Sequence, residues 1–199
     1  MFAGQRVVVR PGVFVPRRRT ELLVAQARAL LVPGAVVVDL CCGSGAVGAA
    51  LLAQPVAIEL YLSDIDEAAT RCAALNVGTR GTVLTGDLFD PLPASLRGRV
   101  QVLAVNAPYV PTSSIALMPP EARLHEARVA LDGGDDGLDV QRRVIEGAPR
   151  WLSPTGTLLV ETSERQAEAT AGLFRAGGLV PRVLRSSELD ATVVAGGLA

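Results

Sequence analysis

Three glycines have a spacing that lets a backbone approach a bound ligand closely. Gly43, Gly45 and Gly48 satisfy the pattern G-x-G-x-x-G and follow the apolar run at residues 36–40. Between a strand and a helix, this pattern allows a tight turn and places backbone N–H groups at a helix amino terminus. Asp64 comes 19 residues after Gly45 (64 − 45 = 19), near the position of an acid that binds ribose hydroxyls. The spacing predicts an adenosine cofactor and leaves nicotinamide and other adenosine cofactors open.

A second polar segment follows the apolar run at residues 100–105. It reads Asn106-Ala107-Pro108-Tyr109. This segment resembles the Asn-Pro-Pro-Tyr motif of class I S-adenosylmethionine-dependent methyltransferases that act on planar nitrogen, with Ala in place of the first Pro. The resemblance favours S-adenosylmethionine over a nicotinamide as the adenosine cofactor.

Other segments of the chain resemble one family within that class. This family methylates the amide nitrogen of a glutamine side chain in peptide-chain release factors. The matching segments occur in the family's order over essentially the whole chain and lie at residues 16–21, 86–89, 106–109 and 130–138.

The resemblance implies where S-adenosylmethionine would bind. Its amino-acid end is expected on Asp39 and on the loop of Cys41, Gly43 and Gly45. Its ribose is expected on Asp64 and Ile65, and its adenine on Asp87 and Leu88. Arg17 and Thr20 are expected to close the pocket beside its methionine portion.

The resemblance also implies a catalytic segment for the methyl acceptor. The acceptor NH₂ is expected to donate hydrogen bonds to Asn106 and to the carbonyl of Ala107. Asn106 would also border the cofactor. Pro108 and Tyr109 would form a wall against the plane of the acceptor NH₂. An amide nitrogen is a poor nucleophile because its lone pair is delocalised into the carbonyl. Two fixed acceptors on its hydrogens favour a pyramidal nitrogen and act most strongly in the transition state.

Three departures from the family pattern limit what is carried over. Cys41 replaces a glycine and is expected to be a packing residue with no nucleophilic role. Ala107 keeps a backbone carbonyl but lacks the fixed φ angle of proline. The chain starts at residues that we expect to form a β-hairpin, so the N-terminal helical domain of the release-factor enzymes is expected to be missing.

The order of apolar runs predicts the fold that positions these residues. Strands are expected at residues 36–40, 58–63, 82–85, 100–105, 157–161, 180–184 and 191–195, and helices at 20–31, 45–52, 67–76, 138–151 and 165–176. Alternating strands and helices predict an α/β fold with a doubly wound, mostly parallel seven-stranded sheet. The short connection before residues 191–195 predicts an antiparallel last strand. Residues 106–136, which include His125, are expected to form a long functional loop.

Length and composition agree with one catalytic domain. The chain has 199 residues, so we expect a single domain with an N-terminal β-hairpin (residues 1–18) and a catalytic core (residues 19–199). Its three cysteines form no C-x-x-C pair, and a reduced, cytoplasmic protein without a bound metal is expected. The absence of an apolar run of about 18 residues argues against a membrane span.

Several functions remain as alternatives to methylation of protein glutamine. A formal net charge of −1 argues against a nucleic-acid partner, although the exocyclic amine of a flipped base would suit the same motif. A small natural product with a planar amide or amine is a further acceptor. A non-catalytic domain that binds S-adenosylmethionine and a partner protein is the alternative outside enzymes. The expected partner is a protein or peptide with an exposed glutamine, such as a release factor.

Overall fold

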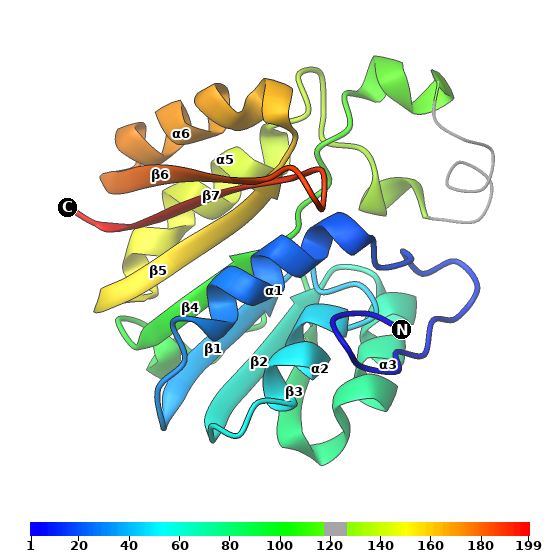
Figure 1. Cartoon of the computed structure of the whole chain (residues 1–199), viewed down its shortest axis with the longest axis vertical. Helices are drawn as coiled ribbons and strands as arrows, with labels where there is room; N and C mark the ends of the chain where they lie inside the picture. The colour runs from blue at the N-terminus through cyan, green and yellow to red at the C-terminus, as the bar shows by residue number, and fades with distance from the viewer. Residues whose placement is uncertain (118–126) are drawn as a thin grey trace.

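The fold is a seven-stranded sheet covered by helices on both faces (Figure 1). The computed structural model describes residues 1–117 and 127–199. The strand order is β3-β2-β1-β4-β5-β7-β6. The strands are β1 (Ala35–Leu40), β2 (Ile58–Asp64), β3 (Gly81–Thr85), β4 (Val100–Val105), β5 (Leu152–Thr162), β6 (Leu179–Ser186) and β7 (Ala191–Leu198). The helices are α1 (Glu21–Arg28), α2 (Ala46–Leu52), α3 (Glu67–Val77), α5 (Asp139–Gly147) and α6 (Ala167–Ala176).

The sheet topology confirms the predicted doubly wound α/β fold. Strands β3, β2, β1, β4 and β5 pair in parallel, and β7 pairs antiparallel with both β5 and β6. The chain moves outward from β1 through β2 to β3, then returns to β4 on the other side of β1. The carboxyl ends of β1 and β4 therefore flank the point at which the strand order reverses, where open α/β sheets bind ligands.

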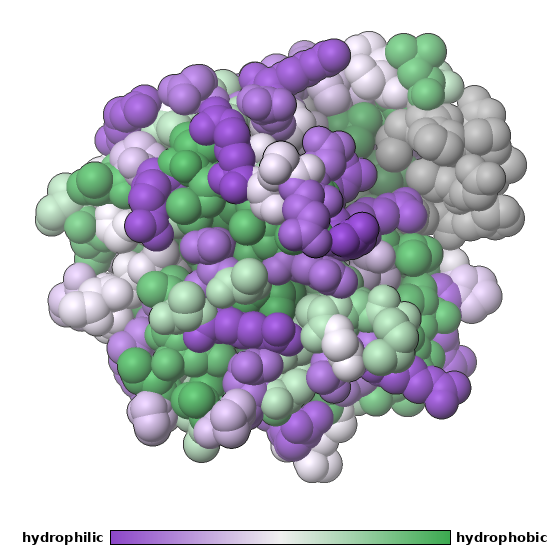
Figure 2. Space-filling view, viewed as in Figure 1, coloured by the Kyte–Doolittle hydropathy of each residue, from purple (hydrophilic) through white to green (hydrophobic). Residues whose placement is uncertain are grey.

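Two buried apolar layers hold the helices on the sheet. On one face, residues of α1, α2 and α3 pack with Val37, Leu62 and Val193 of the sheet. On the other face, α5 and α6 pack with Val38 and Leu103. All six residues of β1 are buried, as expected for a central parallel strand. On the outside, hydrophilic and hydrophobic residues are interspersed over the face seen in Figure 2.

The predicted N-terminal β-hairpin is wrong. Residues 6–17 contain no strand, and their one turn is closed by a hydrogen bond from the Val13 N–H to the Arg10 carbonyl. The side chain of Asn76 on α3 bonds both the N–H and the carbonyl of Val8, at 2.8 Å each. Val9 and Val13 pack against α3 instead of facing each other across a ladder. A helix side chain thus satisfies the polar backbone groups that a partner strand would have taken.

Several element boundaries also differ from the prediction. Helix α1 ends at Arg28, and the predicted helix at residues 138–151 divides into α5 and a 3₁₀ turn, η6 (Ala148–Arg150). Strand β5 begins at Leu152, five residues before the predicted start. The sequence pattern placed this start too late because Pro154 and Gly156 are of residue types that are uncommon inside strands. Gly156 lies against the carbonyl of Val100, where a Cβ atom would come within 2.3 Å of the oxygen.

The described part of the segment after β4 contains the short 3₁₀ helices η4 (Thr112–Leu117) and η5 (Arg128–Ala130). Part of the predicted long loop, with His125, lies outside the described residues. Within residues 1–117 and 127–199, none of the helices has the length and apolar character needed to span a membrane.

Candidate functional site

A cleft of about 880 Å³ opens at the carboxyl ends of the central strands. Its volume is in the range of ligand-binding pockets in proteins. Of the residues predicted to bind cofactor or acceptor, all but Gly45 line this one cleft: Arg17, Thr20, Asp39, Cys41, Gly43, Asp64, Ile65, Asp87, Leu88, Asn106, Ala107, Pro108 and Tyr109. Residues from five separate segments of the chain thus line one cleft.

Gly45 lies behind the wall of the cleft and serves helix packing. It precedes α2 with a φ angle of +73°, and a Cβ atom there would lie 2.8 Å from the Cβ of Ala73 on α3. A Cβ atom on Gly48 would lie 2.7 Å from the Cδ2 of Leu62. The two glycines let α2 approach both α3 and β2, which brings the amino terminus of α2 to the cleft.

Asp39 is a buried carboxylate in the wall of the cleft, with 2% of its surface exposed. Its Oδ2 accepts a hydrogen bond from the N–H of Gly48 at 3.1 Å. Burial raises the pKa of Asp39 to about 7, and the charge of Asp64 adds to this effect, while the Gly48 bond opposes it. A cationic group in the cleft would stabilise the ionised carboxylate.

Asp64 ends β2 and fixes the glycine-rich loop. Its Oδ2 accepts from the N–H of Gly43 at 2.8 Å, and its Oδ1 accepts from the N–H of Asp66 at 2.9 Å. Burial raises its pKa. A carboxylate has about four acceptor positions, so acceptor capacity remains for hydroxyl groups in the cleft.

Asp87 faces an arginine that the motif analysis did not identify. Arg143 on α5 also lines the cleft and donates to Asp87 Oδ2 at 2.7 Å. The neighbouring Leu88 has a φ angle of +48°, and its carbonyl accepts from the Ser63 hydroxyl at 2.9 Å. Arg143 lies in an amphipathic helix, and no feature of its local sequence indicates a contact with Asp87.

The segment from Asn106 to Tyr109 is held at both ends. The Nδ2 of Asn106 donates to the Thr20 hydroxyl at 3.3 Å. The Tyr109 hydroxyl donates to Glu161 at 3.4 Å, and the Tyr109 carbonyl accepts from Gln166 Nε2 at 3.0 Å. Sequence patterns did not identify Gln166, because its contact with Tyr109 spans 57 residues.

Glu161 lies at the end of β5, behind the cleft, with 1% of its surface exposed. Burial raises its pKa to about 7, whereas the Thr20 hydroxyl, the positive charge of Arg19 and the Tyr109 hydroxyl lower it. Burial is also the main cause that raises the pKa of Tyr109 to about 12. At neutral pH the Tyr109 hydroxyl therefore stays protonated and acts as the donor in its hydrogen bond to Glu161.

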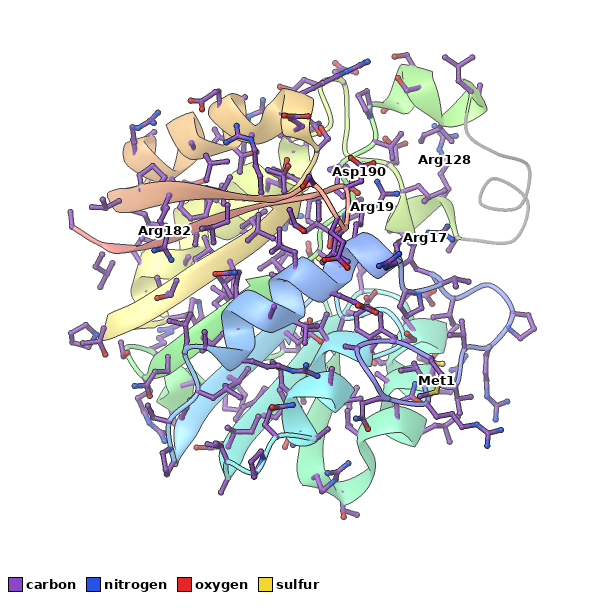
Figure 3. The ribbon with its side chains drawn as sticks, viewed as in Figure 1. Met1, Arg17, Arg19, Arg128, Arg182 and Asp190 are labelled. Atoms are coloured by element: carbon purple, nitrogen blue, oxygen red, sulfur yellow. The ribbon has the colours of Figure 1, made fainter. Side chains whose placement is uncertain are left out.

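Three arginines give one end of the cleft a positive charge. Arg17, Arg19 and Arg128 line it, and Figure 3 shows Arg17 and Arg19 at the amino-terminal end of α1. Arg17 stacks over the ring of Phe14 at 5.2 Å, and Arg128 pairs with Asp132 at 3.2 Å. Their charges favour an electron-rich or anionic group at this end.

Cys41 lines the cleft as a thiol with a raised pKa. Burial is the largest cause, and the charges of Asp64, Asp39 and Asp87 add to it. Its φ angle of +55° lies in the left-handed region that favours glycine. The expected packing role agrees with this environment, because a nucleophilic cysteine needs a lowered pKa. Among the described residues, no three histidine, cysteine or acidic side chains cluster as metal ligands would.

Comparison with known proteins assigns the chain to a family. The methyltransferase small domain family matches residues 4–136, which is more than half of the chain. The chain belongs to this methyltransferase family. The matched residues include the glycine-rich loop, Asp64 and the Asn106–Tyr109 segment. S-adenosylmethionine is the cofactor that the family and the fold imply.

Two relatives of this methyltransferase domain have different substrates in their names. It is 37% identical over 180 residues to the release factor glutamine methyltransferase of Geobacter sulfurreducens, covering 89% of this chain and 62% of the relative. It is 35% identical over 185 residues to a 4-amino-L-phenylalanine/4-methylamino-L-phenylalanine methyltransferase of Streptomyces pristinaespiralis, covering 89% and 63%. The chain thus spans less than two thirds of the length of either relative.

A solved structure confirms the methyltransferase fold. The ribosomal protein L11 methylase of Lactobacillus delbrueckii subsp. bulgaricus superposes with a TM-score of 0.68 over 96% of this chain and 83% of that chain. The two sequences are 12% identical, so the likeness concerns the fold alone.

Proposed function

We propose that this domain transfers a methyl group from S-adenosylmethionine to a planar amide nitrogen, that of a glutamine side chain in a peptide-chain release factor. The observation that carries the proposal is the position of Asn106, whose side chain shares one cleft with Asp39 and Asp64. The name of the Geobacter relative supports glutamine as the acceptor. In this proposal residues 19–199 form the catalytic core, and the enzyme works where release factors do, in the cytoplasm.

The cleft fits S-adenosylmethionine by its charges. Asp39 is a buried carboxylate whose ionised form lacks a cationic partner among the described residues, and the ammonium of the amino-acid end would supply one. The acceptor positions left on Asp64 suit the ribose hydroxyls, and Asp87 with Leu88 suits the adenine. When bound, the cofactor supplies a methyl group already activated on a sulfonium.

The acceptor amide would be oriented by the Asn106 segment. Thr20 occupies the Nδ2 of Asn106, so the Oδ1 of the same side chain is left to accept from the acceptor NH₂. With the Ala107 carbonyl as the second acceptor, both hydrogens of that NH₂ are held and its lone pair can be directed at the methyl carbon. Orientation of this kind removes translational and rotational freedom before the chemical step.

An aromatic amine is the second candidate acceptor. The name of the Streptomyces relative supports it, because that enzyme acts on the amino group of an aromatic amino acid. An arylamine presents the same kind of NH₂ group to the two hydrogen-bond acceptors of the Asn106 segment. This segment therefore suits an arylamine as well as a glutamine amide as the methyl acceptor. The positive end of the cleft would suit the carboxylate of a free amino acid.

Transfer of labelled methyl from S-adenosylmethionine tests the proposal. We expect label in release factor at glutamine, at a higher rate than in 4-amino-L-phenylalanine. Asn106→Ala should lower the rate about 10²–10³-fold, as loss of one transition-state hydrogen bond does. Gln54→Ala removes an amide away from the cleft and serves as the control. Label only in the aromatic amino acid or in nucleic acid would reject glutamine as the acceptor.

Absence of label in every acceptor, together with S-adenosylmethionine binding by isothermal titration, would favour the non-catalytic alternative. Absence of binding as well would reject the assignment of this cofactor.

A further inference from the structure

Glu161 is a buried carboxylate that the proposed methyl transfer does not itself use. It projects from the end of β5 and faces the start of α1 and the loop after β4. Its Oε1 accepts from the Tyr109 hydroxyl, whereas its Oε2 is buried without a hydrogen-bond partner among the described residues. A charged oxygen that is buried without a hydrogen-bond partner destabilises the folded state. A buried acceptor of this kind calls for a donor close by.

Thr20 is the donor placed to serve it. Its Oγ1 already accepts from Asn106 Nδ2 at 3.3 Å, so its own proton is not used in that contact. The same hydroxyl lies near enough to Glu161 to stabilise the ionised carboxylate. A hydroxyl has one proton and two lone pairs. Thr20 can therefore donate to Glu161 and accept from Asn106 at the same time.

The direction of these hydrogen bonds decides which end of the Asn106 amide faces the cleft. An ionised carboxylate only accepts, so it holds the Thr20 proton and leaves Thr20 to accept from the amide nitrogen. The amide oxygen is then presented to the cleft. We propose that Glu161 is a positioning residue that sets the orientation of the Asn106 side-chain amide through the hydroxyl of Thr20. This inference rests on the proposed function, in which the Asn106 oxygen binds the acceptor NH₂.

Protonation of Glu161 would reverse the chain of hydrogen bonds. A neutral carboxyl can donate to Thr20, whose proton then turns toward Asn106. The side-chain amide of Asn106 would then rotate so that its oxygen accepts this hydrogen bond. The NH₂ of Asn106 would face the NH₂ of the methyl acceptor, and two donors cannot hydrogen-bond to each other. The groups that face Glu161 are Arg19 of η1 (Arg18–Thr20) and Tyr109 after β4, and its pairing partner on β7 is Val193.

The two asparagines of the chain make the orientation measurable without substrate. In protein labelled with ¹⁵N at asparagine, only Asn76 and Asn106 give side-chain NH₂ signals. Asn76 Nδ2 donates to the carbonyls of Val8 and Ser44, far from Glu161 in sequence, and serves as an internal control. We expect the Asn106 signal to move with pH, with a midpoint near the pKa of about 7 given to Glu161 by its burial.

Glu161→Gln tests the assignment with an isosteric change. The Asn106 signal of this variant should not titrate, while the Asn76 signal stays unchanged. Glu164→Gln makes the same change at an exposed carboxylate three residues along and should leave the Asn106 titration in place. A titration that is absent in the wild type, or that persists in Glu161→Gln, would overturn the inference. In the latter case the titrating group would be another one, such as Asp39.

Thr20 variants test the relay separately from the carboxylate. Thr20→Ser keeps a hydroxyl and should retain the Asn106 titration. Thr20→Val removes the hydroxyl with little change of shape and should abolish it. An unchanged titration in Thr20→Val would show that Glu161 does not act through this hydroxyl and would overturn the proposal. Thermal unfolding of each variant confirms that it is folded.

Kinetics with the labelled-methyl assay give a second readout. In Glu161→Gln we expect kcat to fall about 10- to 100-fold, because the NH₂ of the methyl acceptor would be misoriented for transfer. The affinity for S-adenosylmethionine should stay within twofold of the wild type. The wild-type kcat should fall as pH falls through 7, and Glu161→Gln should lack this acid limb. A wild type that transfers no methyl rejects the proposed function, whereas an active wild type with an unchanged variant rejects only the role of Glu161.

Discussion

Asp39→Asn should stabilise the protein at alkaline pH while weakening its cofactor binding. The fold raises the pKa of Asp39 from 3.8 to about 7, mainly by burial. Between these two values the unfolded chain has released the proton and the folded chain has kept it. The stabilising contribution of the neutral carboxyl is therefore fully present below pH 3.8 and is lost as pH rises through about 7.

The size of this effect follows from the difference between the two pKa values. About three pH units at about 1.4 kcal/mol each give a cost of about 4 kcal/mol for the ionised group at pH 8. At pH 5 the cost is about 2 kcal/mol, because the folded state is still protonated there. Asparagine is neutral throughout, and its extra buried N–H groups cost about 1–3 kcal/mol at every pH. The advantage of Asp39→Asn should thus grow by about 2 kcal/mol between pH 5 and pH 8.

Urea unfolding at the two pH values measures this difference directly. Each kcal/mol corresponds to about 2–4 °C in Tm for a chain of this length. Asp135→Asn, at an exposed carboxyl, is the matched control and should show no such growth. Isothermal titration should show S-adenosylmethionine affinity reduced about 10- to 100-fold, since a charged hydrogen bond contributes about 1.5–3 kcal/mol. A stability difference between Asp39→Asn and wild type that is the same at both pH values would refute this reasoning.

Three further changes test the site and its supports. Gly45→Ala should destabilise the protein by about 2–4 kcal/mol in urea unfolding, because its Cβ would lie 2.8 Å from that of Ala73 at a φ angle of +73°; a loss below 0.5 kcal/mol would contradict the close helix contact. Tyr109→Phe removes a hydrogen bond that lowers the pKa of Glu161, so the Asn106 titration should move to higher pH, and a downward move would count against that bond. Cys41 should react with iodoacetamide at pH 8 at least tenfold more slowly than free cysteine, because burial and three nearby carboxylates raise its pKa; rapid alkylation would reject the packing role.

The central part of the fold was predictable because its signals are local. Strand β1 is apolar except for Asp39, and the glycine-rich loop after it must turn sharply into α2. In a parallel sheet the carboxyl ends of all strands meet at one edge, so residues after β1, β2 and β4 had to come together. The positions of Asp39, Asp64 and Asn106 in one cleft follow from this geometry.

The N-terminal segment was mispredicted because its pattern has two solutions. In residues 6–16, two short apolar runs flank a proline-glycine pair, as the strands of a hairpin flank its turn. Asn76 on α3 offers the Val8 backbone the same two hydrogen bonds that one strand pairing would supply. An isolated two-stranded hairpin is marginally stable, so a helix face with apolar contacts for Val9 and Val13 is the better partner. The choice depends on a contact 68 residues away, which no local pattern contains.

The substitution of alanine for proline at position 107 was expected to loosen the acceptor-binding segment. The structure compensates through contacts on either side of Ala107, which is itself buried. Asn106 is tied to Thr20, and the Tyr109 carbonyl is held by Gln166. Proline would restrict one backbone angle, whereas these bonds fix the two ends between which the angle lies. The carbonyl of Ala107 can therefore keep its direction without the proline ring, and the departure from the family motif does not by itself argue against methyl transfer.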